Sequence, residues 1–539
     1  FAHLKTLENL GWLHLPVFSD KFTPAGLSRL MVHLPGCEAS SNSFYNQKSA
    51  DRYPYLSSAR AAALYLKANV PADELAADDR HQMARLLLDS KDGVELEHDE
   101  QGRAAGVTFS GIPLSSDHLQ LLSWLPQLSS VSMNYSRVEE SLVGPSDLSE
   151  QDMPLPEDGM PLPEHLATSE LPAFQQSDLA SLARISGLEN LQLDGEFFTD
   201  DVIEHVIQLK GLRSLELSTP RLTGATLAQL KQLPGLQEIS FSSCEELTDE
   251  GLLAIAAIPG IRSLSFFDCK KITSKGLTGI LSLPELERLT LDEAAKNLDE
   301  QLLEKLTASH LKSVTLVGEL DDSICARLAA IASLEEVTLS STVVRGEQLG
   351  RLQGLEGLVT LKLEGCTSLT TEGLRQLNQL TGLKRLHLNH TEVSDEKLLQ
   401  LTDLAQLEFL DLRVNESLTD AGLAALAAMP RLQELSLFYC PGIQGAGFVH
   451  VAKLSDLKVL NIGNNKIQDE GLERLSENRS IQELKASLNQ NITDAGVVHL
   501  AKMKQLKKLE LRFSNQVTPV LIEKLSVELP ACKITPSQR

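Results

Sequence analysis

The sequence predicts an α/β solenoid, a right-handed curved array with a parallel sheet on its inner side and helices on its outer side. Three observations support this prediction. Pairs of apolar residues, separated by one position, recur at a mean interval of about 24.5 residues between Leu191 and Leu511. A small or hydrogen-bonding residue follows most pairs at a fixed distance. A pattern typical of a helix start comes next. The chain is therefore expected to grow by stacking repeats.

The apolar pairs predict short strands, because alternate side chains of a strand point to the same face. Two earlier pairs, Val107/Phe109 and Val131/Met133, share the spacing. The regular pairs are Leu191/Leu193, Leu215/Leu217, Ile239/Phe241, Leu264/Phe266, Leu289/Leu291, Val314/Leu316, Val337/Leu339, Leu361/Leu363, Leu386/Leu388, Leu410/Leu412, Leu435/Leu437, Leu460/Ile462, Leu484/Ala486 and Leu509/Leu511.

The residue five positions after the first member of a pair is here called the ladder position. Side chains of this size and polarity can satisfy backbone groups at the turn between strand and helix. We therefore expect them to be buried. The residues at this position are Cys244, Cys269, Thr342, Cys366, Thr391, Asn415, Cys440, Asn465 and Asn489.

A helix is expected after each ladder position. In the segment 247–252, Leu-Thr-Asp-Glu-Gly-Leu, the threonine is placed to cap the helix, and the acids suit its positive end. Apolar residues then recur three apart at Leu252, Ile255 and Ile258, which predicts one buried helix face.

These repeats resemble the leucine-rich repeats of the ribonuclease-inhibitor-like and cysteine-containing subclasses. The segment 244–252, Cys-x-x-Leu-Thr-Asp-x-Gly-Leu, is similar to F-box leucine-rich-repeat receptors. The shorter period and the Leu-Pro-Ala-Cys ending at 529–532 resemble large bacterial leucine-rich-repeat proteins of planctomycetes. The resemblance covers roughly 105–135 and 175–534. It implies a horseshoe-shaped solenoid that binds partners on its concave face.

The repeat pattern divides the chain into five parts. Segment 1–37 is expected to be the C-terminal end of an upstream array, because 34–37, Leu-Pro-Gly-Cys, matches the ending at 529–532. The alternative is an ordinary internal repeat followed by an insertion. The other parts are a linker with a helix (38–77), a capping helix and hairpin (78–106), the array (107–534) and a tail (535–539).

An insertion at 141–172 interrupts the array. It holds six prolines and seven acidic residues but no lysine or arginine. Sequence of this kind tends to stay extended. It is interpreted as a solvated loop or, alternatively, as an acidic docking segment or a flap over the concave face.

Composition excludes several function classes. The chain has 73 acidic and 49 basic residues, a net charge of −24, which disfavours binding to nucleic acid. The densest basic stretch, Lys504–Lys508, has acids on either side.

No apolar run is long enough to span a membrane. The cysteines at ladder positions favour a reducing cytoplasm, although a targeting signal is expected to precede Phe1.

Motifs for phosphate binding, serine hydrolysis and metalloproteases are missing, so neither catalysis nor a cofactor is expected. His387 and His390 could form part of a metal site, but their spacing across a strand end does not bring the rings together. No metal site and no small-molecule substrate are therefore predicted.

A partner-binding surface is predicted on the concave face, where aromatic and arginine side chains stand out among small polar ones. His387, Arg413 and Phe438 are expected to lie side by side on consecutive strands. The alternative for Phe438 and Tyr439 is packing at the edge between strand and turn. The predicted residues are His387, His390, Arg413, Phe438, Tyr439, Arg512, Phe513 and Phe267.

The predicted function is that of a non-catalytic scaffold that binds a protein partner. One alternative is a structural component of a cell surface or assembly. Another is the targeting half of a larger enzyme, such as a ubiquitin-ligase-like protein or a kinase.

Overall fold

The computed structural model describes residues 94–99, 103–110, 121–134 (except 123 and 126), 176–292 and 300–536 (except 515). It also describes the backbone of two short strands, β1 (Trp12–His14) and β2 (Glu38–Ser40). The chain forms two compact units, Phe1–Ile261 and Arg262–Arg539.

In the first unit, a hairpin precedes the parallel strands. β3 (Val94–His98) pairs antiparallel with β4 (Ala104–Ser110), and the Arg103 side chain donates to Asp99 in the turn between them. β5 (Ser130–Asn134), β6 (Asn190–Asp194), β7 (Ser214–Ser218) and β8 (Glu238–Ser242) follow in parallel register. The hairpin begins within the segment 78–106 and its second strand extends four residues into the segment predicted to be the array.

The helical segments of the first unit are short. Those described between residues 176 and 261 are the 3-10 helix η5 (Gln176–Arg184), α6 (Val202–Val206), the 3-10 helix η6 (Leu227–Gln232) and α7 (Asp249–Ile255). Thr248 caps α7, since its side-chain oxygen accepts a hydrogen bond from the Gly251 amide at 3.4 Å. Leu252, Ile255 and Ile258 are buried, as their spacing predicts.

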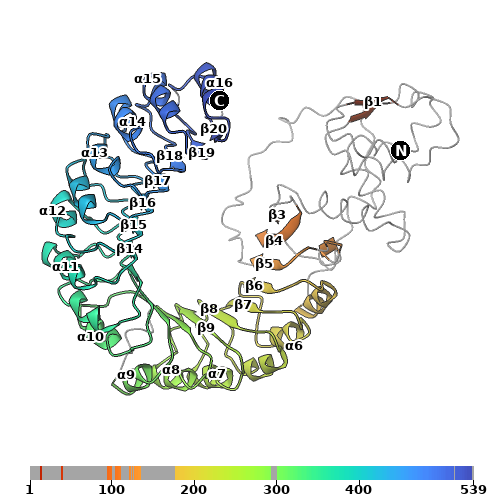
Figure 1. The fold of residues 1–539 in the computed structure, drawn as a ribbon. Coiled ribbons are helices and arrows are strands. Elements are labelled where there is room, and N and C mark those ends of the chain that lie inside the picture. The colour runs from red at the N-terminus through yellow and green to blue at the C-terminus, as the bar shows by residue number, and fades with distance from the viewer. Residues whose placement is uncertain are drawn as a thin grey trace, which may run out of the picture. The chain divides into compact units, whose positions relative to one another are not determined.

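The second unit contains a continuous parallel sheet in which each strand pairs with the next one along the chain (Figure 1). Within this unit the helices lie on the outer side of the strands. The strands are β9 (Ser263–Phe267), β10 (Arg288–Leu291), β11 (Ser313–Val317), β12 (Glu336–Ser340), β13 (Thr360–Lys362), β14 (Arg385–His387), β15 (Phe409–Asp411), β16 (Glu434–Ser436), β17 (Val459–Asn461), β18 (Glu483–Lys485), β19 (Lys508–Glu510) and β20 (Lys533–Thr535).

In the described residues of the second unit, the outer segments are partly α-helix and partly 3-10 helix. The α-helices are α8 (Ser274–Ile280), α9 (Glu300–Thr307), α10 (Ser323–Leu328), α11 (Thr371–Gln376), α12 (Asp395–Leu398), α13 (Phe448–Val451), α14 (Asp469–Leu475), α15 (Asp494–Val497) and α16 (Pro519–Glu528). The 3-10 helices are η8 (Leu349–Gly354), η9 (Leu377–Gln379), η10 (Gly422–Ala428) and η11 (Val498–Lys502).

The interior consists of stacked aliphatic layers closed by the ladder residues. All nine predicted ladder side chains are buried. Asn489 shows how they act: its amide nitrogen donates to the carbonyls of Ile462 and Ala486. Its oxygen accepts from the backbone amides of Asn465 and Ile467. One side chain thus satisfies four backbone groups and joins neighbouring repeats.

Few of the residues before the array are described, so most predictions for this part of the chain stay predictions. β1 and β2 pair in parallel, with Leu13 opposite Ala39. The strand β2 lies at the start of the segment predicted to be a linker. The helix predicted at 78–89 and the insertion at 141–172 lie outside the described residues.

Candidate partner-binding surface

One residue in almost every repeat of the second unit has a left-handed backbone. It lies directly before the ladder position, and its φ angle is between +50° and +67° from Asp268 to Phe513. This conformation is the turn that leads out of the strand. It costs little for glycine, as at Gly365, and more for residues with a large or branched side chain.

In the last repeats four of these left-handed positions carry apolar side chains, of which three are exposed and Val414 is half-buried. The polar residues His390 and Asn464 occupy the same place in two other repeats. We call Val414, Tyr439, Leu488 and Phe513 the edge row, because they follow the carboxyl ends of β15, β16, β18 and β19. Tyr439 is 38% exposed, Leu488 39% and Phe513 55%. The earlier repeats have Ser243, Asp268 and Ser341 at the same place.

The edge row combines two costs. A left-handed backbone costs a non-glycine residue about 1–3 kcal/mol, and an exposed apolar side chain gains no burial in this chain. The fold requires neither feature, because the earlier repeats form the same turn with small polar residues. Backbone strain of this kind concentrates at functional sites, and exposed apolar side chains without a packing role are typical of interaction surfaces.

A charged cluster lies on the strands next to the edge row. Asp411 is buried, and Arg413 donates to both of its carboxylate oxygens at 2.7–2.9 Å. The Nδ1 atom of His387 lies 3.8 Å from a carboxylate oxygen of Asp411 and 3.8 Å from one of Glu364. Neither ring nitrogen of His387 has a hydrogen-bond partner among the described residues.

Packing contacts hold this cluster together. The His387 ring lies against Phe409, with 4.6 Å between ring centroids, and the Arg385 guanidinium stacks 3.9 Å above the same phenyl ring. Burial raises the pKa of Asp411, but contacts with His387 and Arg413 outweigh burial, so the pKa lies below its usual value. Asp411 is therefore a fixed negative charge under Arg413.

The predicted alignment of His387, Arg413 and Phe438 is wrong. The sheet register places His387 opposite Asp411, and Asp411 opposite Ser436. Arg413 and Phe438 lie two residues beyond the ends of β15 and β16, whereas His387 is the last residue of β14. Arg413 still reaches the cluster through its long side chain, whereas Phe438 packs 3.0 Å from the place a Cβ atom would take on Gly463.

The remaining predicted residues divide into two groups. His390, Arg512 and Phe513 are exposed, and they follow the carboxyl ends of β14 and β19 at the same edge of the sheet as Tyr439. Phe267 is half-buried at the end of β9, five strands before β14, so the structure does not bring it to the others. Sequence reasoning missed Val414 and Leu488, although both precede a ladder residue and could have been found by that position.

The cysteines of the array have no reactive character. Burial raises the pKa of Cys440 to about 11 and that of Cys325 to about 12, so both thiols stay protonated at neutral pH. In the described part of the chain, no group of three or more histidine, cysteine or acidic side chains is arranged to hold a metal. None of the described helices is long and apolar enough to cross a membrane.

The family model for leucine-rich repeats matches residues 234–256 and 453–476. These segments contain the helices α7 and α14 with their flanking turns, one in each unit. The chain carries leucine-rich repeats. Its fold is an α/β leucine-rich-repeat solenoid, as the sequence predicts. The subclass and the likeness to planctomycete proteins stay predictions. No curated protein sequence matches this chain.

Several solved leucine-rich-repeat structures resemble this solenoid at low identity. A leucine-rich-repeat protein of Leptospira interrogans is 21% identical over 66% of this chain and 91% of its own, with a TM-score of 0.38. A chain of the Rad7 and Elc1 complex in yeast is 18% identical (58% and 84% covered, TM-score 0.41). An internalin of Listeria monocytogenes is 17% identical (81% and 87%, TM-score 0.25). Likenesses this distant carry no argument about function.

Proposed function

We propose that this protein is a non-catalytic scaffold that binds a protein partner through its last repeats. The observation that carries the proposal is the edge row, where exposed apolar side chains occupy strained backbone positions without a role in the fold. Tyr439 and Phe513 are the anchors, since aromatic side chains supply large contact areas at interfaces.

The neighbouring residues supply polarity and charge. Arg413, held by Asp411, and Arg512 lie among the apolar side chains, and arginine is enriched at protein interfaces. His387, His390 and Phe438 complete the proposed surface, and Phe267 is its most distant member. A partner that fits would present an apolar ridge flanked by carboxylates.

A capture experiment tests the proposal. The triple variant Tyr439→Asn, Leu488→Asn, Phe513→Asn removes the apolar side chains, and asparagine tolerates the left-handed backbone. Purified wild type and variant are used as baits in a lysate of the source organism, and bound proteins are quantified by mass spectrometry. We expect at least one protein to bind the wild type and to be depleted about tenfold or more with the variant.

The matched control removes apolar side chains of similar exposure from the helical side. Leu253, Val449 and Val498 are 38%, 41% and 37% exposed, and the triple variant Leu253→Asn, Val449→Asn, Val498→Asn should capture the same proteins as the wild type. The proposal fails if the edge-row variant captures every protein that the wild type does, or if the control loses the same protein.

A further inference from the structure

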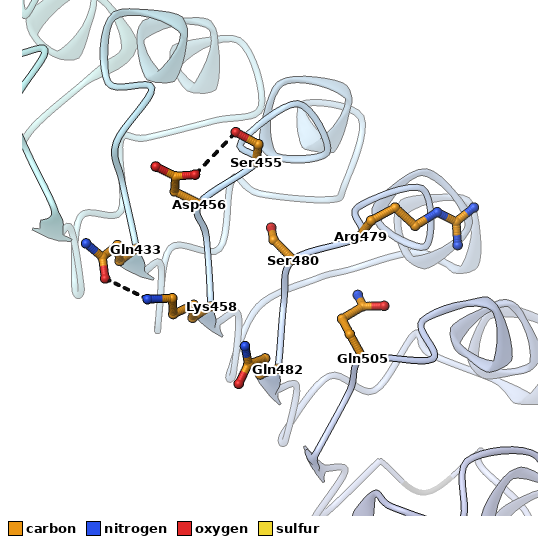
Figure 2. Close-up of a pocket in the computed structure, with 8 residues that line it drawn as sticks. All are labelled: Gln433, Ser455, Asp456, Lys458, Arg479, Ser480, Gln482 and Gln505. Atoms are coloured by element: carbon orange, nitrogen blue, oxygen red, sulfur yellow. Dashed lines mark hydrogen bonds between the residues drawn. The ribbon is translucent and has the colours of Figure 1, made fainter.

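A polar groove lies at the opposite ends of the strands that carry the edge row. The turns that lead into β16, β17, β18 and β19 enclose a volume of about 450 Å³, and Figure 2 shows the side chains around it. Because parallel strands run the same way, this groove and the edge row occupy opposite edges of one sheet.

A straight row of residues forms one wall of the groove. The Lys458 amide donates to the Gln433 carbonyl at 2.7 Å, and the Gln482 amide donates to the Lys458 carbonyl at 2.8 Å. The Lys507 amide continues the row by donating to the Gln482 carbonyl at 2.7 Å. Amide and ammonium side chains therefore alternate at the spacing of strands, about 4.8 Å.

A buried asparagine next to the groove holds two of its turns together. Asn478 takes a place that other repeats fill with Leu or Met, as at Leu454 and Met503. It is buried, and its side chain donates to the Leu454 carbonyl and accepts from the Ser480 and Ile481 amides. The turns on either side of the groove are thereby fixed to each other, so a ligand would meet a preformed site.

Several groups that line this groove are available to a ligand. The Gln482 side chain makes no hydrogen bond in the described part of the chain, and the Lys458 ammonium bonds only to the Gln433 amide oxygen. Arg479 donates to the Lys502 carbonyl. Asp456 is the single acid of the lining, against Lys458 and Arg479, while Glu477 outside the lining pairs with Arg479 at 3.8 Å.

The surrounding repeats have the opposite charge from the rest of the protein. Residues 430–539 carry 15 lysines and arginines against 11 acids, whereas the whole chain carries 49 against 73. A ligand with negative charge is therefore attracted to this end of the solenoid and repelled elsewhere.

We propose that the groove binds an extended acidic segment of a partner protein. Carboxylates of the segment pair with Lys458 and Arg479, and its backbone amides exchange hydrogen bonds with the side chains of Gln433, Gln482 and Gln505, which can both donate and accept. This site is separate from the edge row and goes beyond the function proposed above.

Fluorescence anisotropy with a labelled octapeptide of alternating glutamate and serine tests this proposal at low salt. We expect saturable binding that weakens as salt screens the charges. Gln482→Glu is the sharpest variant, because it is isosteric, breaks no hydrogen bond and places a negative charge in the groove. It should weaken binding about fivefold or more, and Lys458→Glu with Arg479→Glu should weaken it further.

Three controls make the result decisive. Arg351→Glu reverses an exposed charge outside the groove and should bind as the wild type does, as should the edge-row triple variant. A lysine–serine octapeptide should not bind. The proposal is overturned if the acidic peptide does not bind, if Gln482→Glu has no effect while circular dichroism shows a folded protein, or if poly-uridylate competes for the groove more tightly than the peptide.

Discussion

Val414 is the most strained residue of the edge row. It is β-branched and has a φ of +59°, whereas Gly365 fills the equivalent place two repeats earlier at +67°. Relief of about 1–3 kcal/mol of strain is partly offset by the flexibility of glycine in the unfolded chain, about 0.5–1 kcal/mol. Val414 is also half-buried, so loss of its side chain costs about 1 kcal/mol more. Val414→Gly should therefore leave the free energy of unfolding nearly unchanged, measured as an unshifted urea midpoint.

The matched control for this prediction is Val459→Gly in β17, where the backbone is extended. That change should lower the free energy of unfolding by about 1 kcal/mol, because glycine disfavours a strand. Equal losses from both substitutions would show that the left-handed turn is not strained.

Asp411 gives the fold a dependence on pH at the acid end. Its folded pKa lies below the ordinary value of 3.8, because the contacts with His387 and Arg413 outweigh the opposing effect of burial. A lowered pKa means that the carboxylate stabilises the fold above about pH 3.8 and loses this effect as the pH falls through the folded pKa.

Asp411→Asn should thus lower the free energy of unfolding at pH 7 by about 1–3 kcal/mol, since hydrogen bonds to a charged group are lost. The difference from the wild type should shrink as the pH falls below 4 in urea titrations. Asp403→Asn, at an exposed carboxylate, should change little at any pH. A difference that stays constant from pH 7 to pH 3 would contradict the role of charge.

The sequence predicts some of these residues well and others poorly. The ladder position has a narrow set of small and polar residues, so its spacing reveals it. The left-handed position has no such narrow set and cannot be recognised from residue type. The residues found there are Ser, Asp, His, Val, Tyr, Asn, Leu and Phe. The grouping of Asp411 with His387 depends on strand register, which becomes visible only when neighbouring repeats are counted from the same residue.

At the scale of elements, close contact between repeats depends on paired glycines. Gly251 at the start of α7 lies against Gly224 of the preceding repeat, and an added Cβ atom would come within 2.7 Å of the Gly224 Cα. Gly346 meets Gly373, and Gly445 meets Gly471, in the same way. The helix starts can therefore approach the preceding turn only without side chains.

Gly251→Ala should lower the free energy of unfolding by about 1–3 kcal/mol, because backbone on both sides must shift. Gly382→Ala is the control, since nothing lies within 4 Å of the added atom. It should be neutral or stabilising by about 0.5 kcal/mol through the unfolded chain. Chemical denaturation of both variants checks the pair, and a neutral Gly251→Ala would show that the contact relaxes freely.

The outer segments are less predictable than the strands. The threonine caps and apolar spacing locate each segment, as at Thr248 and Thr493. They do not decide between α-helix and 3-10 helix, because the repeat leaves room for only one or two turns and the hydrogen-bond patterns differ little over that length.

For the whole molecule, the ladder divides the array into a weaker and a stronger part. Repeats before residue 320 have no asparagine at the ladder position, whereas Asn415, Asn465 and Asn489 follow later. Asn415 donates to the Leu388 carbonyl at 2.8 Å and accepts from the Val393 amide, so it ties two repeats together. A cysteine thiol is a weaker donor, as in the bond from Cys244 to the Leu217 carbonyl.

Stability in a solenoid is approximately a sum over repeats and their interfaces. Amides in 410–500 should therefore exchange with deuterium more slowly than those in 176–260, and the earlier segment should lose protection at lower urea concentrations. Asn489→Ala leaves four backbone groups without partners, and each loss costs about 1–3 kcal/mol. This variant should therefore narrow the difference in exchange rate between the two segments. Cys440→Ala should change that difference little. Uniform protection across both segments, with a single transition, would show that the array unfolds as one unit and that the ladder does not set its local stability.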